Sequence, residues 1–178
     1  HVSTKTSLDI IRKAKGAGIS VTCDVTPHHL LLTEERVKGY DTNAKMYPPL
    51  RTEEDRRDLV QGLKDGVIDC IATDHAPHVK DEKDLDFDLA PFGIIGLQTL
   101  LPGMMKVHKD TGIEFIDLLR CVTTNPARIL GIDGGALCPG ARADITLFDP
   151  DATWIFAEEC ILSKSKNSPF IGQEFQGR

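Results

Sequence analysis

The sequence lacks several features that would assign it to a functional class at once. Its 178 residues contain no apolar run of 18 or more, so we expect no membrane-spanning helix. Lysine and arginine never cluster densely and the formal net charge is −6, which argues against nucleic acid as a partner. No secretory or transit segment is recognisable, although the first residue is not methionine. The remaining composition, 40% hydrophobic and 27% charged, is that of an ordinary globular domain.

The cysteines lack the spacing of a thiolate metal site. They are odd in number, far apart and never in a Cys-x-x-Cys pair: Cys23, Cys70, Cys121, Cys138 and Cys160. This usage predicts free thiols in a reducing cytoplasm and argues against zinc bound by thiolates.

Helix-like and strand-like segments alternate over most of the chain. Apolar spacing and capping residues predict helices over residues 7–14, 53–65, 97–108, 116–123 and 125–130. Strands are predicted over residues 19–25, 68–74, 143–150, 153–156 and 170–175. Alternation in the first part predicts a parallel sheet with right-handed crossovers, and a turn-rich stretch places a domain boundary near residue 136. Two parallel strands are too few for a closed barrel, so we expect the others to precede the first residue.

The most informative stretch is the second predicted strand and the residues after it. The apolar run 68–72 is followed by Asp74-His75-Ala76-Pro77-His78. Asp74 would stand at the carboxyl end of the strand, the edge where parallel α/β barrels carry their chemistry. Pro77 fixes a backbone torsion and so restricts the direction of His78. An ordinary turn after a strand has the same composition, so these residues alone leave both interpretations open.

Two further segments allow a structural and a functional interpretation. His28 and His29 are adjacent, and in extended chain they would point to opposite sides, so at most one could face a site. We expect a structural role for both. Residues 79–89 carry seven charged side chains, which favours a solvated loop, although the position beside Asp74 also suits a mobile lid.

Short motifs along the whole chain occur in an order shared with one family. They are His1-Val2-Ser3-Thr4, Thr26-Pro27-His28-His29-Leu30, Pro48-Pro49-Leu50-Arg51, Asp74-His75-Ala76-Pro77-His78, Pro91-Phe92-Gly93, Asn125-Pro126-Ala127-Arg128, Gly140-x-x-Ala143-Asp144 and Ser163-Lys164-x-x-Asn167-x-Pro169-Phe170. Each motif is weak alone, but their order and spacing are specific. With them the chain resembles the dihydroorotases of the bacterial class I type, in the cyclic amidohydrolase superfamily.

The resemblance implies an α/β fold in two parts. Residues 1–135 would be the C-terminal portion of a metal-dependent (β/α)8 TIM-like barrel, and residues 136–178 part of a small β-sandwich. The family's His-x-His after the first barrel strand is absent here. The chain therefore resembles the C-terminal part of a longer enzyme, beginning at a metal ligand.

The implied activity is the zinc-dependent interconversion of N-carbamoyl-L-aspartate and L-dihydroorotate in pyrimidine synthesis. Two residues match the family's metal ligands, His1 and Asp74. Asp74 is also implied to be catalytic, carrying a proton from the attacking water to the leaving amide nitrogen. The complete enzyme would hold one or two zinc ions, absent from or weakly held by this chain alone, which we expect to be inactive.

The implied substrate contacts lie around the lid. His78 and the backbone of Phe92 and Gly93 would touch the substrate. Tyr47 stands where the family usually has asparagine, so a phenol with one hydroxyl replaces a carboxamide that both donates and accepts. This departure puts the usual substrate fit in question.

Two alternatives stay open. The chain could belong to another cyclic-amide hydrolase, such as a hydantoinase or allantoinase, or to a non-catalytic dihydroorotase-like partner of aspartate transcarbamoylase. The expected partners are the small-molecule substrate, the missing N-terminal part, and a second copy or aspartate transcarbamoylase. Nucleic acid and membrane are not expected, and the implied location is the cytoplasm.

Overall fold

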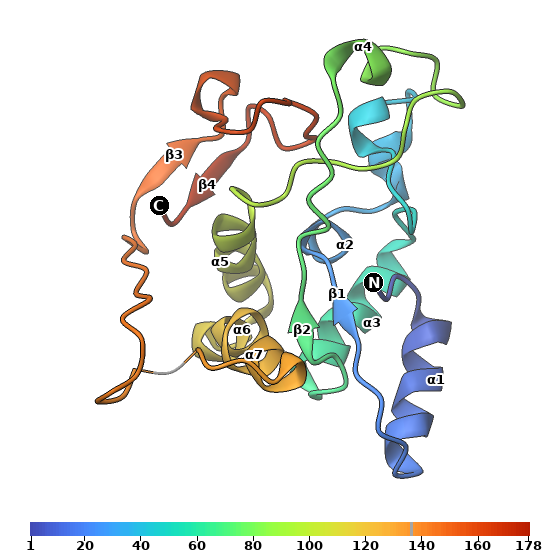
Figure 1. Ribbon diagram of the computed structural model, residues 1–178. Coiled ribbons are helices and arrows are strands. Elements are labelled where there is room, and N and C mark those ends of the chain that lie inside the picture. The colour runs from blue at the N-terminus through green and yellow to red at the C-terminus, as the bar shows by residue number, and fades with distance from the viewer. Residues whose placement is uncertain (136) are drawn as a thin grey trace.

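The computed structural model describes residues 1–135 and 137–178 as a mixed arrangement of helices and short strands (Figure 1). The longer helices are α1 (Lys5–Gly16), α3 (Glu53–Lys64), α5 (Leu100–Thr111), α6 (Phe115–Val122) and α7 (Thr124–Leu130). Shorter ones are α2 (Pro27–Leu31), α4 (Lys80–Lys83), and the 3-10 turns η1 (Glu34–Val37), η2 (Thr42–Ala44) and η3 (Glu158–Cys160). Across the described ranges, none of the helices has both the length and the apolar character needed to cross a bilayer.

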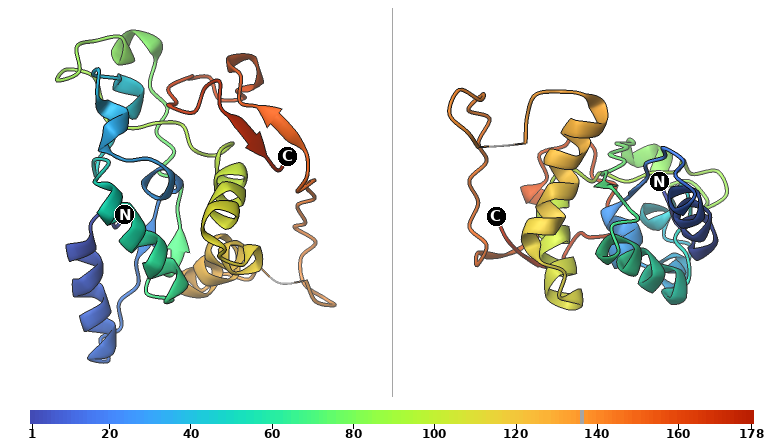
Figure 2. Two further views of the ribbon diagram at one scale, coloured as in Figure 1. Left: turned by 180° about the vertical axis from the view of Figure 1, so that it is seen from behind. Right: turned by 90° about the horizontal axis from the view of Figure 1, so that it is seen from below.

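Two parallel strands occupy the middle of the molecule. β1 (Asp24–Val25) pairs with β2 (Cys70–Ile71), with Asp24 opposite Cys70 and Val25 opposite Ile71. Figures 1 and 2 show α1 and α3 on one side of this pair and α5, α6 and α7 on the other. The predicted parallel pairing is confirmed, and it brings the carboxyl ends of β1 and β2 to the same edge.

Both strands are shorter than the sequence pattern predicts. Residues 19–23 and 72–74, expected to be strand, have no strand conformation here. A ladder forms only where a neighbouring chain segment supplies hydrogen-bonding groups. Within the described residues, β1 and β2 have only each other as strand partners, and their shared register is two residues long.

The helix starts follow their local capping residues. The Thr4 side chain accepts a hydrogen bond from the Ser7 amide at the start of α1, and Thr52 accepts one from the Asp55 amide at the start of α3. Such caps satisfy amides that have no partner within the helix. The Thr52–Asp55 capping pattern is confirmed, since the Thr52 hydroxyl also lies 2.9 Å from the Asp55 carboxylate.

The segment after β1 differs from the expected strand end. Thr26 caps α2 and Pro27 occupies its first turn, so His28 and His29 lie on a helix rather than in extended chain. Proline suits this position because the first helical amides lack intrahelical partners in any case. The two imidazoles do not point to opposite sides as predicted: their ring centroids lie 4.6 Å apart, and both side chains are buried.

The C-terminal segment forms a smaller β unit. β3 (Thr153–Ile155) and β4 (Glu174–Gln176) pair in antiparallel fashion. The strand predicted over residues 143–150 is wrong, because that stretch has no strand conformation and Leu147 is 91% exposed. The boundary expected near residue 136 lies outside the described residues.

Two hydrophobic clusters hold these parts together. The first joins β1 and β2 to α1, α3, α5 and α6, with Leu8, Val25 and Leu59 among its fully buried members. The second packs the C-terminal segment, through Phe156 and Phe170, against residues 44–50 and 94–95. The second cluster therefore fixes the chain directly after the loop formed by residues 84–93 and packs it against residues 44–50.

The contact between α1 and α3 depends on Gly62. A Cβ atom at this position would lie 2.7 Å from a Leu8 methyl carbon, and Leu8 is only 1% exposed. We expect Gly62→Ala to lower the free energy of unfolding by about 1–2 kcal/mol, because overpacking outweighs the better helix propensity of alanine. Gly16→Ala is the control, since a Cβ atom at that position would meet nothing within 4 Å. Urea unfolding followed by circular dichroism measures both, and equal midpoints would contradict the expectation.

Candidate functional site

The centre of the candidate site is His1, which lies between two carboxylates. Its Nε2 atom is 3.6 Å from Oδ1 of Asp74, and its Nδ1 atom is hydrogen-bonded to Oδ1 of Asp24. Asp24 belongs to β1, and Asp74 follows β2 by three residues, so the parallel pairing of the strands brings both acids to His1. The three side chains are 25% (His1), 33% (Asp24) and 34% (Asp74) exposed, which leaves the group open to small molecules.

Asp74 has an unusual backbone conformation. Its φ is 48°, and Tyr40 is the other non-glycine residue with positive φ in the described chain. Aspartate tolerates this left-handed region better than most residues, but the conformation still costs free energy, and such outliers gather at functional sites. Burial raises the pKa of the Asp74 carboxyl, and the nearby charge of Asp24 acts in the same direction, whereas the His29 ring lowers it.

The donor set and its spacing fit a zinc ion. Imidazole nitrogen and carboxylate oxygen both bind zinc at about 2.0–2.2 Å, so two such ligands in tetrahedral geometry lie roughly 3.4 Å apart. The 3.6 Å between His1 Nε2 and Asp74 Oδ1 is close to this value. The bond from Nδ1 to Asp24 favours the tautomer that keeps a lone pair on Nε2. Among residues 1–135 and 137–178, no group of three or more His, Cys, Asp or Glu side chains is arranged to hold a metal ion.

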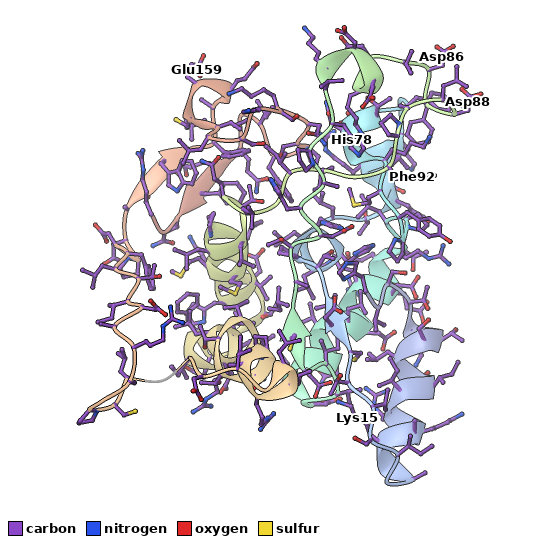
Figure 3. All side chains as sticks on the ribbon, viewed as in Figure 1. Lys15, His78, Asp86, Asp88, Phe92 and Glu159 are labelled. Atoms are coloured by element: carbon purple, nitrogen blue, oxygen red, sulfur yellow. The ribbon has the colours of Figure 1, made fainter. Side chains whose placement is uncertain are left out.

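His78, Phe92 and Gly93, singled out from the sequence, lie together in the structure, and Figure 3 labels the first two. The His78 Nε2 atom donates to the Phe92 carbonyl oxygen at 2.8 Å. Gly93 has φ 119°, and a Cβ there would lie 2.6 Å from the Ala76 Cβ, so glycine is required for this close approach. The amide of Ala76 donates to the Ile94 carbonyl at 2.8 Å. The residues after Asp74 and the Phe92-Gly93 turn therefore form one connected wall.

Tyr47 lies at the rim of this wall. Its ring centroid is 5.6 Å from that of Phe92, and the two side chains are 73% and 52% exposed. The tyrosine therefore contacts the loop that carries Phe92 and Gly93, on a surface open to solvent.

Sequence reasoning missed two residues that organise the site. Asp24 orients His1, a partner 23 residues away in the sequence that only the fold brings near. Asn167 is buried, accepts from the His78 amide at 3.1 Å, and donates to the carbonyls of Ala76 and Gly93 at 2.9 and 3.1 Å. This one carboxamide joins the segment after Asp74 to the Phe92-Gly93 turn.

The histidine pair on α2 makes contacts inside the protein. The His29 Nδ1 atom bonds the Thr26 hydroxyl at 2.7 Å, and its Nε2 atom donates to the Pro48 carbonyl at 3.0 Å. Burial lowers the pKa of His29, and it lowers the pKa of His28 further. His29 therefore ties α2 to the loop that carries Tyr47, which agrees with a structural role.

Comparison with known proteins identifies the family. The model of the Amidohydrolase family matches residues 1–177. The chain belongs to this family. The amidohydrolase chain is 54% identical over 177 residues to the dihydroorotase of Geobacter metallireducens and 51% identical over 177 residues to that of Geotalea daltonii. In both cases 99% of this chain is matched, and it spans 42% of the relative's length.

Solved structures place the amidohydrolase chain near hydantoinases. The L-hydantoinase of Arthrobacter aurescens superposes with a TM-score of 0.91 at 28% identity, over 99% of this chain and 41% of that one. A D-hydantoinase gives a TM-score of 0.90 at 26% identity, with the same coverage. The resemblance to dihydroorotases inferred from the motifs is thus confirmed, and the arrangement of helices and strands is that of an amidohydrolase.

Proposed function

We propose that the chain is the C-terminal portion of a dihydroorotase, which interconverts N-carbamoyl-L-aspartate and L-dihydroorotate in pyrimidine synthesis. The observation that carries the proposal is the placement of His1 3.6 Å from Asp74, with Asp24 behind it, in a chain 54% identical to a dihydroorotase. The lower identity to hydantoinases, 28% for the Arthrobacter aurescens enzyme, supports dihydroorotate over hydantoin as the substrate.

The proposed architecture follows from the same comparison. β1 and β2 would be two neighbouring strands of a (β/α)8 barrel within residues 1–135, with α3 as the crossover between them. Residues 136–178 would be part of a small β-sandwich. The antiparallel pair of β3 and β4 supports this division, because it lies wholly within residues 136–178. The remaining barrel strands, and the remaining metal ligands, would come from the N-terminal part of the polypeptide.

In this proposal His1 and Asp74 would hold zinc, one or two ions in the complete enzyme and weakly or not at all in this chain alone. Zinc bound there would lower the pKa of a bound water molecule to about 7 and would polarise a carbonyl group. Asp74 takes a proton from the attacking water on its carboxylate and returns it to the amide nitrogen as the ring opens. Asp24 holds the His1 ring in place throughout.

The substrate would be bound by the wall beyond Asp74. Backbone groups of Phe92 and Gly93 offer hydrogen bonds, and His78 offers one to a carboxylate. In the structure His78 Nε2 is already bonded to the Phe92 carbonyl, so contact with substrate requires it to exchange that acceptor. Tyr47 would reach the substrate from the rim, beside Phe92. Such an exchange fits a loop that moves as substrate enters.

Turnover by the complete polypeptide that carries this sequence tests the proposal. We expect hydrolysis of dihydroorotate to exceed that of hydantoin and allantoin, and we expect the 178-residue chain alone to be inactive. A preference for hydantoin or allantoin, or turnover by the chain alone, would contradict the proposal. The wider expectations, a cytoplasmic location and assembly as a homodimer or with aspartate transcarbamoylase, follow from the same assignment.

A chimera separates a defective site from a wrong assignment. Residues 1–178 would replace the matching 42% of the Geobacter metallireducens dihydroorotase, whose own N-terminal part then completes the protein. Dihydroorotase activity in this chimera would show that the chain carries a competent half-site, even with tyrosine at position 47. An inactive but folded chimera would favour the non-catalytic role beside aspartate transcarbamoylase and overturn the proposal.

A further inference from the structure

Two lysines are buried beneath the loop of residues 84–93. Lys45 is 7% exposed and Lys83 is 4% exposed, and the hydrogen bonds of both ammonium groups run to backbone carbonyls rather than to carboxylates. Lysine is rarely buried without a paired charge, because its ammonium group loses hydration. Lys83 was expected to lie in a solvated, charged stretch, so its burial is a departure from the sequence prediction. Because burying two ammonium groups costs free energy, we looked for a function of these lysines in their contacts.

Both ammonium groups bind backbone carbonyls of the same short segment. Lys45 Nζ donates to the carbonyls of Asp88 and Ala90 at 3.1 and 2.6 Å. Lys83 Nζ donates to those of Pro91 and Gly93 at 2.9 and 3.2 Å. Four carbonyls between residues 88 and 93 thus accept hydrogen bonds from two side chains, one from the residue directly after η2 and one from α4.

Further contacts bring Lys45 to the aromatic side of the loop. Lys45 Nζ lies 4.6 Å from the ring centroid of Phe92 and 5.3 Å from that of Phe87. The Lys45 carbonyl also accepts from the Gly93 amide at 2.9 Å. Figure 3 shows Asp86 and Asp88 at the outer edge of the molecule, farther out than Phe92. The backbone and one ring of the Phe92-Gly93 turn are therefore both fixed by Lys45.

We propose that Lys45 and Lys83 are positioning residues that fix the loop 84–93, and with it the Phe92-Gly93 backbone that faces the substrate. The anchoring of the loop stands on the contacts alone, whereas the consequence for substrate binding rests on the proposed function. Lysine suits the task because one ammonium group can donate to several carbonyls that converge on it. A loop that is held by two side chains, rather than by a strand ladder, can open and close again when a few hydrogen bonds break and re-form.

The titration of Lys83 is coupled to closure of the loop. Burial lowers the pKa of Lys83 to about 8, and the neighbouring charge of Lys45 adds to this, while Asp41 opposes it. When the loop opens, water restores the ordinary pKa of 10.5. Between these values the closed state binds fewer protons than the open state, so closure strengthens as pH rises. The neutral amine keeps two N–H donors, which match the carbonyls of Pro91 and Gly93.

Lys83→Met tests the anchoring, with Lys80→Met as the matched control on the exposed side of α4. We expect amides of residues 85–93 to exchange with deuterium about 10- to 100-fold faster in Lys83→Met, because two charge-assisted bonds are lost. Amides of α3 should be unchanged. In turnover assays KM should rise about tenfold, with kcat changed less than about threefold, the pattern of lost substrate binding. Lys45→Met provides a second, independent variant.

The pH dependence distinguishes this role from simple packing. After correction for intrinsic exchange, protection of residues 85–93 in the unmodified protein should increase from about pH 7.5 to about 9.5, and in Lys83→Met it should stay constant. Protection that falls or does not change over this range would overturn the proposal, as would unchanged loop exchange in both variants. These exchange measurements need no substrate. Failure of the dihydroorotase assignment would instead appear as absent turnover with the loop effects intact.

Discussion

Asp74→Asn is expected to reduce kcat for dihydroorotate by about 10²- to 10⁴-fold in the complete polypeptide. Asparagine keeps the size of the side chain and one carbonyl oxygen, but it cannot accept a proton at neutral pH. The left-handed backbone at φ 48° is also tolerated by asparagine, so the fold should survive. Initial rates with dihydroorotate, together with zinc content by mass spectrometry, measure the effect.

The control for this substitution is Asp81→Asn, an exposed acid on α4 that lies only seven residues further along the chain. It should leave kcat unchanged. If Asp74→Asn retained bound zinc and also retained more than about a tenth of kcat, Asp74 would not be the proton carrier. If Asp74→Asn lost both zinc and activity, the loss of activity would reflect the loss of a zinc ligand. The zinc measurement therefore separates the role of Asp74 as a ligand from its role as a proton carrier.

Local features of the fold were predictable because they depend on neighbouring residues. The cap of α3 needs only Thr52 and Asp55, and both lie within one helical turn. Strand lengths were not predictable, because residues 19–23 and 143–150 alternate correctly but find no strand partner within the described residues. The alternation of apolar and polar residues indicates which side chains could face a core. The hydrogen-bond ladder of a strand, in contrast, depends on chain segments that are distant in the sequence.

The candidate site shows the same division. Asp74 and His78 could be singled out because strand, acid and histidine are adjacent in sequence. Asp24, Lys45 and Asn167 could not, because each acts on a partner that only folding brings near. Asn167 bonds to Ala76, 91 residues away, and Asp24 bonds to His1, 23 residues away. A polar residue that fixes another polar residue has no local pattern, so its role is visible only in the structure.

Asp24→Ala should weaken zinc binding by the complete polypeptide about 10- to 100-fold, with a similar loss of activity, although Asp24 is not itself proposed as a ligand. Its carboxylate bonds Nδ1 of His1 and thereby holds the ring with Nε2 directed toward Asp74. Without this carboxylate, the imidazole can rotate or adopt the other tautomer. Zinc binding then becomes weaker, because the ring has to be reordered when the metal binds. Asp24→Asn should be intermediate, because the amide oxygen still accepts from Nδ1–H but carries no charge.

Competition with a zinc chelator measures this effect directly. The control is Asp9→Ala, which removes an exposed carboxylate that pairs with Lys5 and Arg12 on α1 and should leave zinc affinity unchanged. Wild-type affinity in Asp24→Ala would show that His1 is held by other contacts. An orienting carboxylate requires zinc affinity to fall in the order aspartate, asparagine, alanine at position 24. A general loss of stability would not produce this order, because it would not depend on whether the side chain keeps its hydrogen bond or its charge.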